Sequence, residues 1–356
     1  VPNEVFCLCL MIEYIIKSPI GLYRLHSGKW IHDITRIDRW FLSRLQNLVD
    51  YEASIQNGLT PELYQRGKYL GYPDAALRRL SGSETLPPFR AGYKMVDTCA
   101  AEFDAQTPYF YASADTRCEA RTFPRSGKPV VMVLGSGPIR IGQGIEFDYS
   151  SVHCVWTLKA MGYDVVIVNN NPETVSTDYD TSDRLYFEPL TFEDVMNIVE
   201  KEKPEGVIVQ FGGQTPLNLA VPLMRAGVPI LGTSPDAIDR AEDRERFQAL
   251  IEKLGLLQPP NGTAMDLDQA LEVAERITYP VVVRPSYVLG GRAMAVVYDK
   301  EELVEYFREQ VPEKPEHPIL IDKFLEHAVE VDVDALSDGK EVYVAGIMEH
   351  IEEAGI

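Results

Sequence analysis

The chain has 356 residues, of which 34 are basic and 54 acidic, so its net charge at pH 7 is −20. This length predicts two or three domains. A content of 45% hydrophobic and 25% charged residues is typical of a globular protein and excludes a chain that is disordered or fibrous throughout.

The charge is unevenly distributed along the chain. Residues 1–125 carry 15 basic and 14 acidic side chains, whereas residues 126–356 carry 19 and 40. A surface as acidic as the second part repels the phosphates of nucleic acids, so no nucleic-acid partner is expected. A local basic pocket for a nucleotide remains possible.

Cysteine usage and hydropathy favour a cytoplasmic protein with no membrane association. The five cysteines are an odd number and form no C-x₂-C pair, which indicates reduced thiols. Cys7 and Cys9 could bind a metal, but two cysteines of an apolar strand are the preferred interpretation. The longest apolar run, Val5–Ile16, contains Glu13 and is shorter than the ~20 residues of a membrane span. Because the chain begins with Val1, we expect it to be a fragment with an upstream part missing.

Residues 1–125 are predicted to be mostly helical and irregular. One helix is expected across residues 37–48, and shorter ones over 61–70 and 74–80, with Gly71 and Gly82 at the C-terminal caps. No glycine-rich phosphate loop occurs here, so structural packing or interaction is the expected role. The apolar face of the first helix is predicted from its spacing to comprise Ile37, Phe41, Leu45 and Leu48.

After a boundary at residues 121–129, strands and helices alternate. Strand–helix–strand alternation at this spacing predicts a parallel sheet with helices on its faces, an α/β fold. The predicted strands are Val130–Leu134, Val165–Val168, Val207–Phe211 and Val228–Leu231, and the predicted helices are Ser151–Met161 and Thr191–Lys201.

From Ser234 onward, three capped helices are expected among further strands. Ser234, Asp266 and Asp299 are the predicted N-caps. The alternation of Glu330–Asp334 predicts a strand with one wet, acidic face. The chain stops at Ile356 directly after a strand, so we expect the last domain to be cut short. The predicted strands are Val281–Arg284, Ala293–Tyr298, Ile319–Asp322, Glu330–Ala335 and Glu341–Ile347.

Three polar loops follow buried strands. Gly135–Gly142 departs from the dinucleotide pattern G-x-G-x-x-G because Arg140 replaces the third glycine. Asn169–Asn171 also stands where an acidic residue would bind the ribose of NAD, so an oxidoreductase is disfavoured. The loops at residues 169–178 and 211–216 fall at the carboxyl ends of predicted parallel strands, where open sheets place ligands.

Three arginines near one glycine hairpin favour a polyphosphate ligand. Arg284 and Arg292 flank Gly290-Gly291, and Arg244 lies on a helix upstream. Guanidinium groups beside a flexible glycine hairpin can hold phosphates by charge-assisted hydrogen bonds. Surface ion pairs in an acidic domain are the alternative.

The segment after the strand at residues 319–322 suits a nucleoside. A strand edge such as Lys323–Leu325 can present backbone groups to adenine, and Glu330 can accept from ribose hydroxyls. No Ser-His-Asp or Cys-His arrangement has recognisable spacing.

Several long strings of the chain are distinctive. They are Asp38–Leu42, Val96–Phe103, Arg140–Tyr149, Asn171–Asp183, Gly212–Pro216, Arg284–Arg292 and Glu349–Gly355. Through these strings the chain, from about Ile34 to Ile356, resembles the large subunit of carbamoyl-phosphate synthase, a member of the ATP-grasp superfamily. The resemblance implies a helical oligomerisation domain (1–125), a Rossmann-like pre-ATP-grasp domain (126–237) and an incomplete ATP-grasp domain (238–356). The order of these regions looks like the second, carbamate-phosphorylating half of that subunit.

The resemblance also implies roles for particular residues. Arg284 matches a nucleotide-phosphate ligand, and Arg244 matches another arginine placed near the phosphates. Together with Arg292 of the glycine hairpin, they are the expected catalytic residues. Lys323 and Leu325 match adenine-contacting positions, mainly through their backbone. Glu330 matches the ribose carboxylate, and Gly355 and Ile356 match the start of a nucleotide-contacting loop.

The resemblance implies ATP as cofactor with Mg²⁺ or Mn²⁺. The family's metal ligands would lie beyond Ile356, so no metal ligand is expected in this chain, and we expect the chain alone to be inactive. Expected partners are a glutamine amidotransferase small subunit and further copies of the chain through the helical domain. Carbamoyl phosphate feeds arginine and pyrimidine biosynthesis, between which the sequence does not choose. The alternatives are an inert assembly fragment and another ATP-grasp carboxylate ligase.

Overall fold

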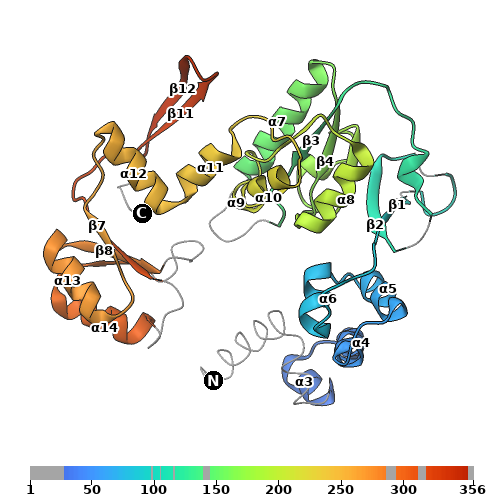
Figure 1. Cartoon of the computed structure of the whole chain (residues 1–356), viewed down its shortest axis with the longest axis horizontal. Coiled ribbons are helices and arrows are strands. Elements are labelled where there is room, and N and C mark those ends of the chain that lie inside the picture. Colours follow the sequence, from blue (N-terminus) through green and yellow to red (C-terminus); the bar gives the residue numbers. More distant parts are fainter. Residues whose placement is uncertain are drawn as a thin grey trace. The chain divides into compact units, whose positions relative to one another are not determined.

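A computed structural model describes residues 28–97, 99–104, 106–114, 117–138, 145–285, 294–311 and 318–351. Among these, nothing is described of the side chains at positions 28, 30, 244, 245 and 285. The described residues form two compact units, one extending to Ile238 and the other beginning at Asp239. Each unit has its own arrangement of helices and strands (Figure 1).

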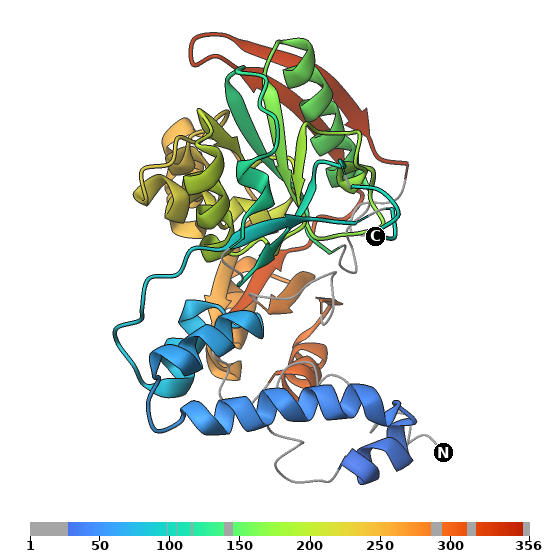
Figure 2. The same ribbon diagram turned by 90° about the vertical axis from the view of Figure 1, so that its right-hand side faces the viewer.

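The described part of the first unit begins with four helices, of which α4 is a long helix drawn in blue in Figure 2. Its C-terminal half contributes Tyr51 and Ile55 to a small core shared with Tyr64 and Leu77. The predicted apolar face of this helix is wrong, since Phe41 is 59% exposed and Leu42 is buried. The second half of α4 packs on α5 and α6, whereas the spacing of apolar residues in its first half does not predict which of them are buried. The helices are α3 (Gly28–Thr35), α4 (Arg39–Ile55), α5 (Pro61–Tyr69) and α6 (Asp74–Ser81).

Glycine ends α6 as predicted. Gly82 is the C-cap of α6 with φ of 68°, a left-handed conformation that a residue with a Cβ rarely adopts. Its amide donates to the carbonyl of Arg78 at 2.9 Å, which satisfies one of the last carbonyl groups of the helix.

A six-stranded sheet forms the centre of the first unit, in the order β1-β2-β5-β4-β3-β6. Strand β1 pairs antiparallel with β2, and the remaining pairs are parallel. The parallel sheet is therefore confirmed. The predicted strand at residues 228–231 contributes only an isolated bridge, Ile230 to Val207. The strands are β1 (Gly92–Met95), β2 (Tyr109–Ser113), β3 (Val130–Leu134), β4 (Asp164–Val168), β5 (Arg184–Tyr186) and β6 (Gly206–Ile208).

The expectation of a helical and irregular region up to residue 125 is wrong for β1 and β2. Both strands are short, and β2 finds its partner in β5, far along the chain. Tyr93 and Phe110 are buried at this edge of the sheet, with ring contacts to Tyr186 at 4.9 and 5.4 Å. Such strands depend on tertiary pairing, which local pattern does not report.

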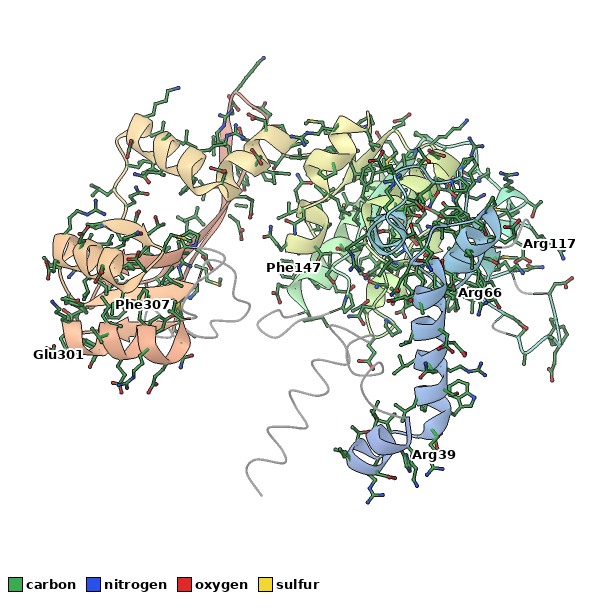
Figure 3. The ribbon with its side chains drawn as sticks, turned by 60° about the horizontal axis from the view of Figure 1, so that its bottom comes forward. Arg39, Arg66, Arg117, Phe147, Glu301 and Phe307 are labelled. Atoms are coloured by element: carbon green, nitrogen blue, oxygen red, sulfur yellow. The ribbon has the colours of Figure 1, made fainter. Side chains whose placement is uncertain are left out.

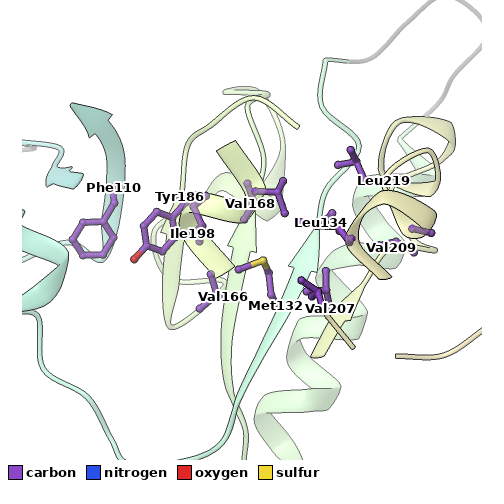
Figure 4. Close-up of a cluster of buried hydrophobic side chains, with 14 of the residues drawn as sticks. Phe110, Met132, Leu134, Val166, Val168, Tyr186, Ile198, Val207, Val209 and Leu219 are labelled. Atoms are coloured by element: carbon purple, nitrogen blue, oxygen red, sulfur yellow. The ribbon is translucent and has the colours of Figure 1, made fainter. Parts of the chain in front are cut away.

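Helices cover both faces of this sheet because successive strand residues point to opposite sides. On one face Val133 and Ile167 pack against Val155 of α7 (Glu146–Ala160). On the other, Met132 and Val166 join Ile198 of α8 in the larger core drawn in Figure 4. The predicted fold class, α/β with a helical N-terminal region, is confirmed. The other helices are α8 (Phe192–Glu202), α9 (Gln214–Leu217), α10 (Ala220–Arg225) and the short 3₁₀ turns η1 (Glu119–Arg121) and η2 (Val175–Thr177).

The second unit contains a four-stranded antiparallel sheet in the order β7-β10-β8-β9. Two helices pack on one face, where Leu303 and Phe307 are buried with Val283 and Ile321. Figure 3 draws these side chains, with Phe307 and the exposed Glu301 labelled on α14. The predicted helices capped by Ser234, Asp266 and Asp299 are confirmed. Helix α11 (Pro235–Glu242) begins in the first unit, where Ile238 joins the core of the six-stranded sheet, and ends in the second. The other elements are α12 (Arg244–Leu254), β7 (Asn261–Ala264), α13 (Leu267–Ile277), β8 (Val281–Pro285), β9 (Ala295–Val297), α14 (Lys300–Gln310) and β10 (Ile319–Lys323).

Within the described part of the chain, the last two strands, β11 (Val331–Ser337) and β12 (Val342–Glu349), pair only with each other. Every residue of both strands is exposed. The expectation of one wet face is therefore corrected, because the apolar face of β11 is exposed as well. Val333 is 55% exposed, and Ile347 opposite to it 70%.

Candidate functional site

Arg284 lies on the face of the four-stranded sheet that α13 and α14 leave uncovered. In the antiparallel pair β8–β10, Val283 is opposite Ile321 and Arg284 is opposite Leu320. Val283 and Ile321 belong to the core beneath the helices. Since neighbouring residues of a strand point to opposite faces, Arg284 projects from the other face. The pairing of β8 with β10 therefore places the Arg284 side chain on the face of the sheet opposite the two helices.

The guanidinium of Arg284 is held loosely. Its Nε lies 3.4 Å from Oδ2 of Asp322, one position along the same face of β10. The two side chains are 44% and 25% exposed, and ion pairs so open to water contribute only ~0–1 kcal/mol. An approaching anion can therefore recruit Arg284 at little cost, which suits the predicted phosphate-binding role.

Lys323 is held more firmly than Arg284, because both its ammonium group and its backbone amide form hydrogen bonds. Its Nζ donates to the carbonyl oxygens of Tyr279 at 2.8 Å and Thr278 at 3.2 Å, and its amide donates to the carbonyl of Pro260 at 2.8 Å. These bonds tie the end of β10 to the segments that precede β8 and β7. The amide of Lys323 is therefore not available for adenine.

Leu325 and Glu330 present groups that the described part of the chain does not satisfy. Leu325 follows β10 with its side chain 52% exposed, and its amide has no partner among the described residues. Glu330 precedes β11. Its carbonyl accepts from the amide of His350 at 3.0 Å, while its exposed carboxylate has no partner in the described chain. An amide donor and a carboxylate flanking one turn fit the edges of adenine and ribose.

Strand pairing brings Arg284 and Lys323 onto neighbouring strands, and chain continuity adds Leu325. Among the residues that the structure describes, no hydrogen bond or ion pair joins Glu330 to these three. Arg244 begins α12, but its side chain is outside the described set. The remaining predicted site residues, Arg292, Gly355 and Ile356, lie outside the described residues.

The described residues of the polar loops that follow β3 and β4 form internal hydrogen bonds, although the buried Oδ1 of Asn170 has no partner among the described residues. The buried Asn169 accepts from the amide of Gly137 at 2.9 Å and donates to Oγ of Ser176 at 2.9 Å. A Cβ on Gly135 would lie 2.5 Å from the Asn169 side chain, and one on Gly212 would lie 2.3 Å from the carbonyl oxygen of Gly135. The glycines here permit close packing of three loops.

Sequence reasoning missed Asp148, which organises one of these loops. Asp148 is 3% exposed on α7, and its carboxylate accepts from the amides of Val175 at 2.9 Å and Ser176 at 3.2 Å. The available signal was an acidic residue just before a predicted helix. The loop that it binds follows 27 residues later, and only the fold brings the two together.

Glu188 is a second buried carboxylate that the sequence did not single out. It is 7% exposed and lines a cavity of about 510 Å³ between α5, β2 and α8. Burial raises the pKa of Glu188 to about 7, and the charge of Asp194 acts in the same direction, while the amide of Ala112 opposes it by donating to the carboxylate.

In the part of the chain that the structure describes, no three metal-ligating side chains gather in a geometry that could hold an ion. Among the same residues, no helix has the length and apolar character to cross a membrane. The three described cysteines, Cys99, Cys118 and Cys154, are free thiols, as expected.

Three family models match consecutive parts of the chain. They are the carbamoyl-phosphate synthetase large chain oligomerisation domain at residues 22–90, the carbamoyl phosphate synthase preATP-grasp domain at 127–240, and the carbamoyl-phosphate synthase L chain ATP binding domain at 243–352. A pre-ATP-grasp sheet followed by an ATP-binding domain that carries Arg284 defines a protein of the ATP-grasp class. Within that class, the chain belongs to the carbamoyl phosphate synthase large-chain family.

Curated relatives agree with this assignment. The carbamoyl phosphate synthase large chain of Methanothermobacter thermautotrophicus is 57% identical over 92% of this chain, and that of Archaeoglobus fulgidus is 56% identical over 92%. The chain spans about a third of the length of these relatives, 31% and 32% respectively. Among solved structures, N5-carboxyaminoimidazole ribonucleotide synthetase from Thermus thermophilus is 18% identical, with a TM-score of 0.49 over 64% of this chain and 56% of that one.

Proposed function

We propose that this chain is part of the large subunit of a glutamine-dependent carbamoyl-phosphate synthase, and that its second unit binds ATP for the phosphorylation of carbamate. The observation that carries the proposal is Arg284, an exposed and loosely paired guanidinium on the face of the four-stranded sheet opposite α13 and α14. The proposal includes an oligomerisation region at 1–125, a pre-ATP-grasp domain at 126–237 and an ATP-grasp domain at 238–356.

The residues present fit a nucleotide. ATP would supply the phosphoryl group, and phosphoryl transfer needs positioning and charge neutralisation more than a nucleophilic side chain. Arg284 neutralises phosphate charge, the amide of Leu325 reads adenine, and Glu330 accepts from the ribose. Arg244 and Arg292 add cations near the phosphates, and Gly355 and Ile356 contribute to the nucleotide loop. Lys323 acts by anchoring the end of β10, since its amide and Nζ are engaged.

The partners and setting follow from the same proposal. Carbamoyl phosphate would serve arginine and pyrimidine biosynthesis in the cytoplasm, ammonia would come from a glutamine amidotransferase small subunit, and Mg²⁺ or Mn²⁺ would accompany ATP. The helical region α3–α6 would join copies of the chain. Support comes from the curated relatives, each named carbamoyl phosphate synthase large chain.

Calorimetric titration with ADP, with and without Mg²⁺, tests the site. The double variant Arg284→Ala, Glu330→Ala should bind ADP at least about tenfold more weakly, because it loses a charge-assisted phosphate contact and a ribose acceptor. The matched control is Arg308→Ala, Glu305→Ala, which removes one exposed cation and one exposed carboxylate from α14. Equal affinity of the site variant and the parent would contradict the proposed site.

A further inference from the structure

A cavity of about 740 Å³ in the first unit is lined mainly by cations. Its volume is within the range of small-molecule sites. The charged side chains at its wall are Arg90, Arg121, Arg125, Lys201, Lys203 and Glu200. Five cations against one carboxylate are notable in a chain whose net charge is −20.

This cavity is separate from the candidate site. Arg90 precedes β1, Arg121 ends η1, and both lysines lie at the carboxyl end of α8. From there the chain enters β6 at Gly206, so the cavity lies at the amino edge of the parallel strands. The polar loops occupy the opposite edge, and Arg284 belongs to the other compact unit.

Apart from Arg125, these cations have no carboxylate partner among the described residues. Arg125 is paired with the buried Glu202 in a two-pronged contact, with Nη2 and Oε1 3.0 Å apart. Arg90, Arg121 and Lys203 form no ion pair with any residue that the structure describes. The two lysines offset the negative end of the α8 dipole, but the arginines stand on other segments and have no such role. Unpaired like charges around one cavity repel each other, and a bound anion would relieve that repulsion.

Lys201 couples the cavity to a cysteine. Its Nζ lies 2.7 Å from Sγ of Cys118 and 5.6 Å from the ring centroid of Tyr93. Burial alone would raise the pKa of Cys118, but the hydrogen bonds from Lys201 and from the amide of Tyr93 outweigh it, so the pKa lies below its ordinary value. An anion that engages Lys201 would weaken this effect, which makes Cys118 a reporter of occupancy.

We propose that this cavity is a second binding site, for a small phosphate-bearing polyanion held by Arg90, Arg121 and Lys203. Guanidinium forks bind phosphate oxygens in pairs, and three cations from three segments can surround a group with two or more negative charges. The site does not depend on the nucleotide site of the second unit.

Titration of the full chain with inorganic pyrophosphate, in buffer with a chelator and no divalent metal, tests the proposal. We expect saturable binding that weakens at least about tenfold in Arg90→Ala, Arg121→Ala, because two charge-assisted contacts are lost. Both arginines are exposed, so folding should be retained, which a thermal melt checks. The control Arg39→Ala, Arg79→Ala removes the same charge from exposed positions outside the cavity and should bind like the parent.

Alkylation of Cys118 by iodoacetamide, followed peptide by peptide with mass spectrometry, gives a second readout. Saturating pyrophosphate should slow alkylation of Cys118 at least threefold and leave Cys154 unchanged. The Arg284→Ala variant should behave like the parent, which separates this site from the nucleotide site. No saturable binding, equal binding by the Arg90→Ala, Arg121→Ala variant, or an unchanged Cys118 rate would each overturn the proposal.

Titrations of the Arg284→Ala variant with ADP and with adenosine show whether the cavity binds a nucleotide or only its phosphate groups. ADP binding more tightly than pyrophosphate would assign the cavity to a nucleotide, and equal binding would assign it to the phosphates alone. Both results support the site. Adenosine binding as tightly as ADP would overturn it, since recognition would then not depend on charge.

Discussion

Glu188 shows how burial changes the acid–base chemistry of a single residue in the first unit. It follows β5, and its carboxylate accepts from the amide of Ala112 on β2. The pKa of Glu188 is raised from 4.5 to about 7, chiefly by burial. A group whose pKa is raised on folding binds its proton more tightly in the folded state. The stabilisation is therefore fully present below pH 4.5 and is lost as the pH rises from 4.5 to 7.

We predict that Glu188→Gln makes the protein more stable than the parent at pH 8 and equally stable near pH 4. The amide keeps an acceptor for Ala112 and removes the buried charge. One pKa unit corresponds to ~1.36 kcal/mol, so the gain in unfolding free energy at pH 8, measured by urea denaturation, should be on the order of 3 kcal/mol. The exposed control Glu309→Gln should leave the pH profile unchanged. A Glu188→Gln profile parallel to the parent's would mean that Glu188 does not titrate in this range.

At the scale of single elements, capping side chains predict where α13 and α14 begin, whereas α7, without a side-chain cap, begins five residues before the predicted Ser151. The N-caps of α13 and α14 are Asp266 and Asp299, and each carboxylate accepts from the amide three residues later at 2.9 Å. Interior strands such as β3, β8 and β10 were likewise predicted nearly to the residue. Their runs of β-branched and apolar residues are buried on both faces or paired on both edges, so pattern and burial agree.

Asp299→Ala should destabilise the second unit by about 1 kcal/mol, because an orphaned amide at the start of α14 loses its acceptor. Asp299→Ser should recover most of that loss, since a hydroxyl can accept the same bond. Denaturation followed by circular dichroism measures both variants. Equal stability of Asp299→Ala and the parent would show that the cap contributes nothing to α14.

At the scale of the whole molecule, the two units have separate hydrophobic cores. Leu223 of α10 is fully buried in the core of the six-stranded sheet, and Leu303 of α14 is fully buried in the core of the four-stranded sheet. No buried residue belongs to both clusters among those described. A cavity made in one core should therefore leave packing in the other intact.

We predict that Leu223→Ala and Leu303→Ala lower the midpoint temperatures of different calorimetric transitions of the full chain. Each substitution removes a buried side chain and should cost ~2–5 kcal/mol in its own unit. The two variants serve as controls for each other because the chemical change is identical. If both lowered every transition by the same amount, the chain would unfold as a single cooperative unit.

The sequence by itself determined the parallel sheet, the capped helices of both units and the family resemblance. The sheet and the caps rest on patterns within a few neighbouring residues. The family resemblance rests on strings of residues distributed along the chain. It also pointed to Arg284, Lys323 and Glu330, but not to what each side chain contacts.

Only the tertiary structure decided which surfaces are buried. It placed β1 and β2 at the edge of the sheet, left Phe41 and both faces of β11 exposed, and joined Asp148 to a loop 27 residues away. It also gathered Arg90, Arg121 and Lys203 around one cavity. The physical reason is the same in each case. Burial and charge clustering depend on contacts between segments far apart in the chain, and local periodicity carries no information about such contacts.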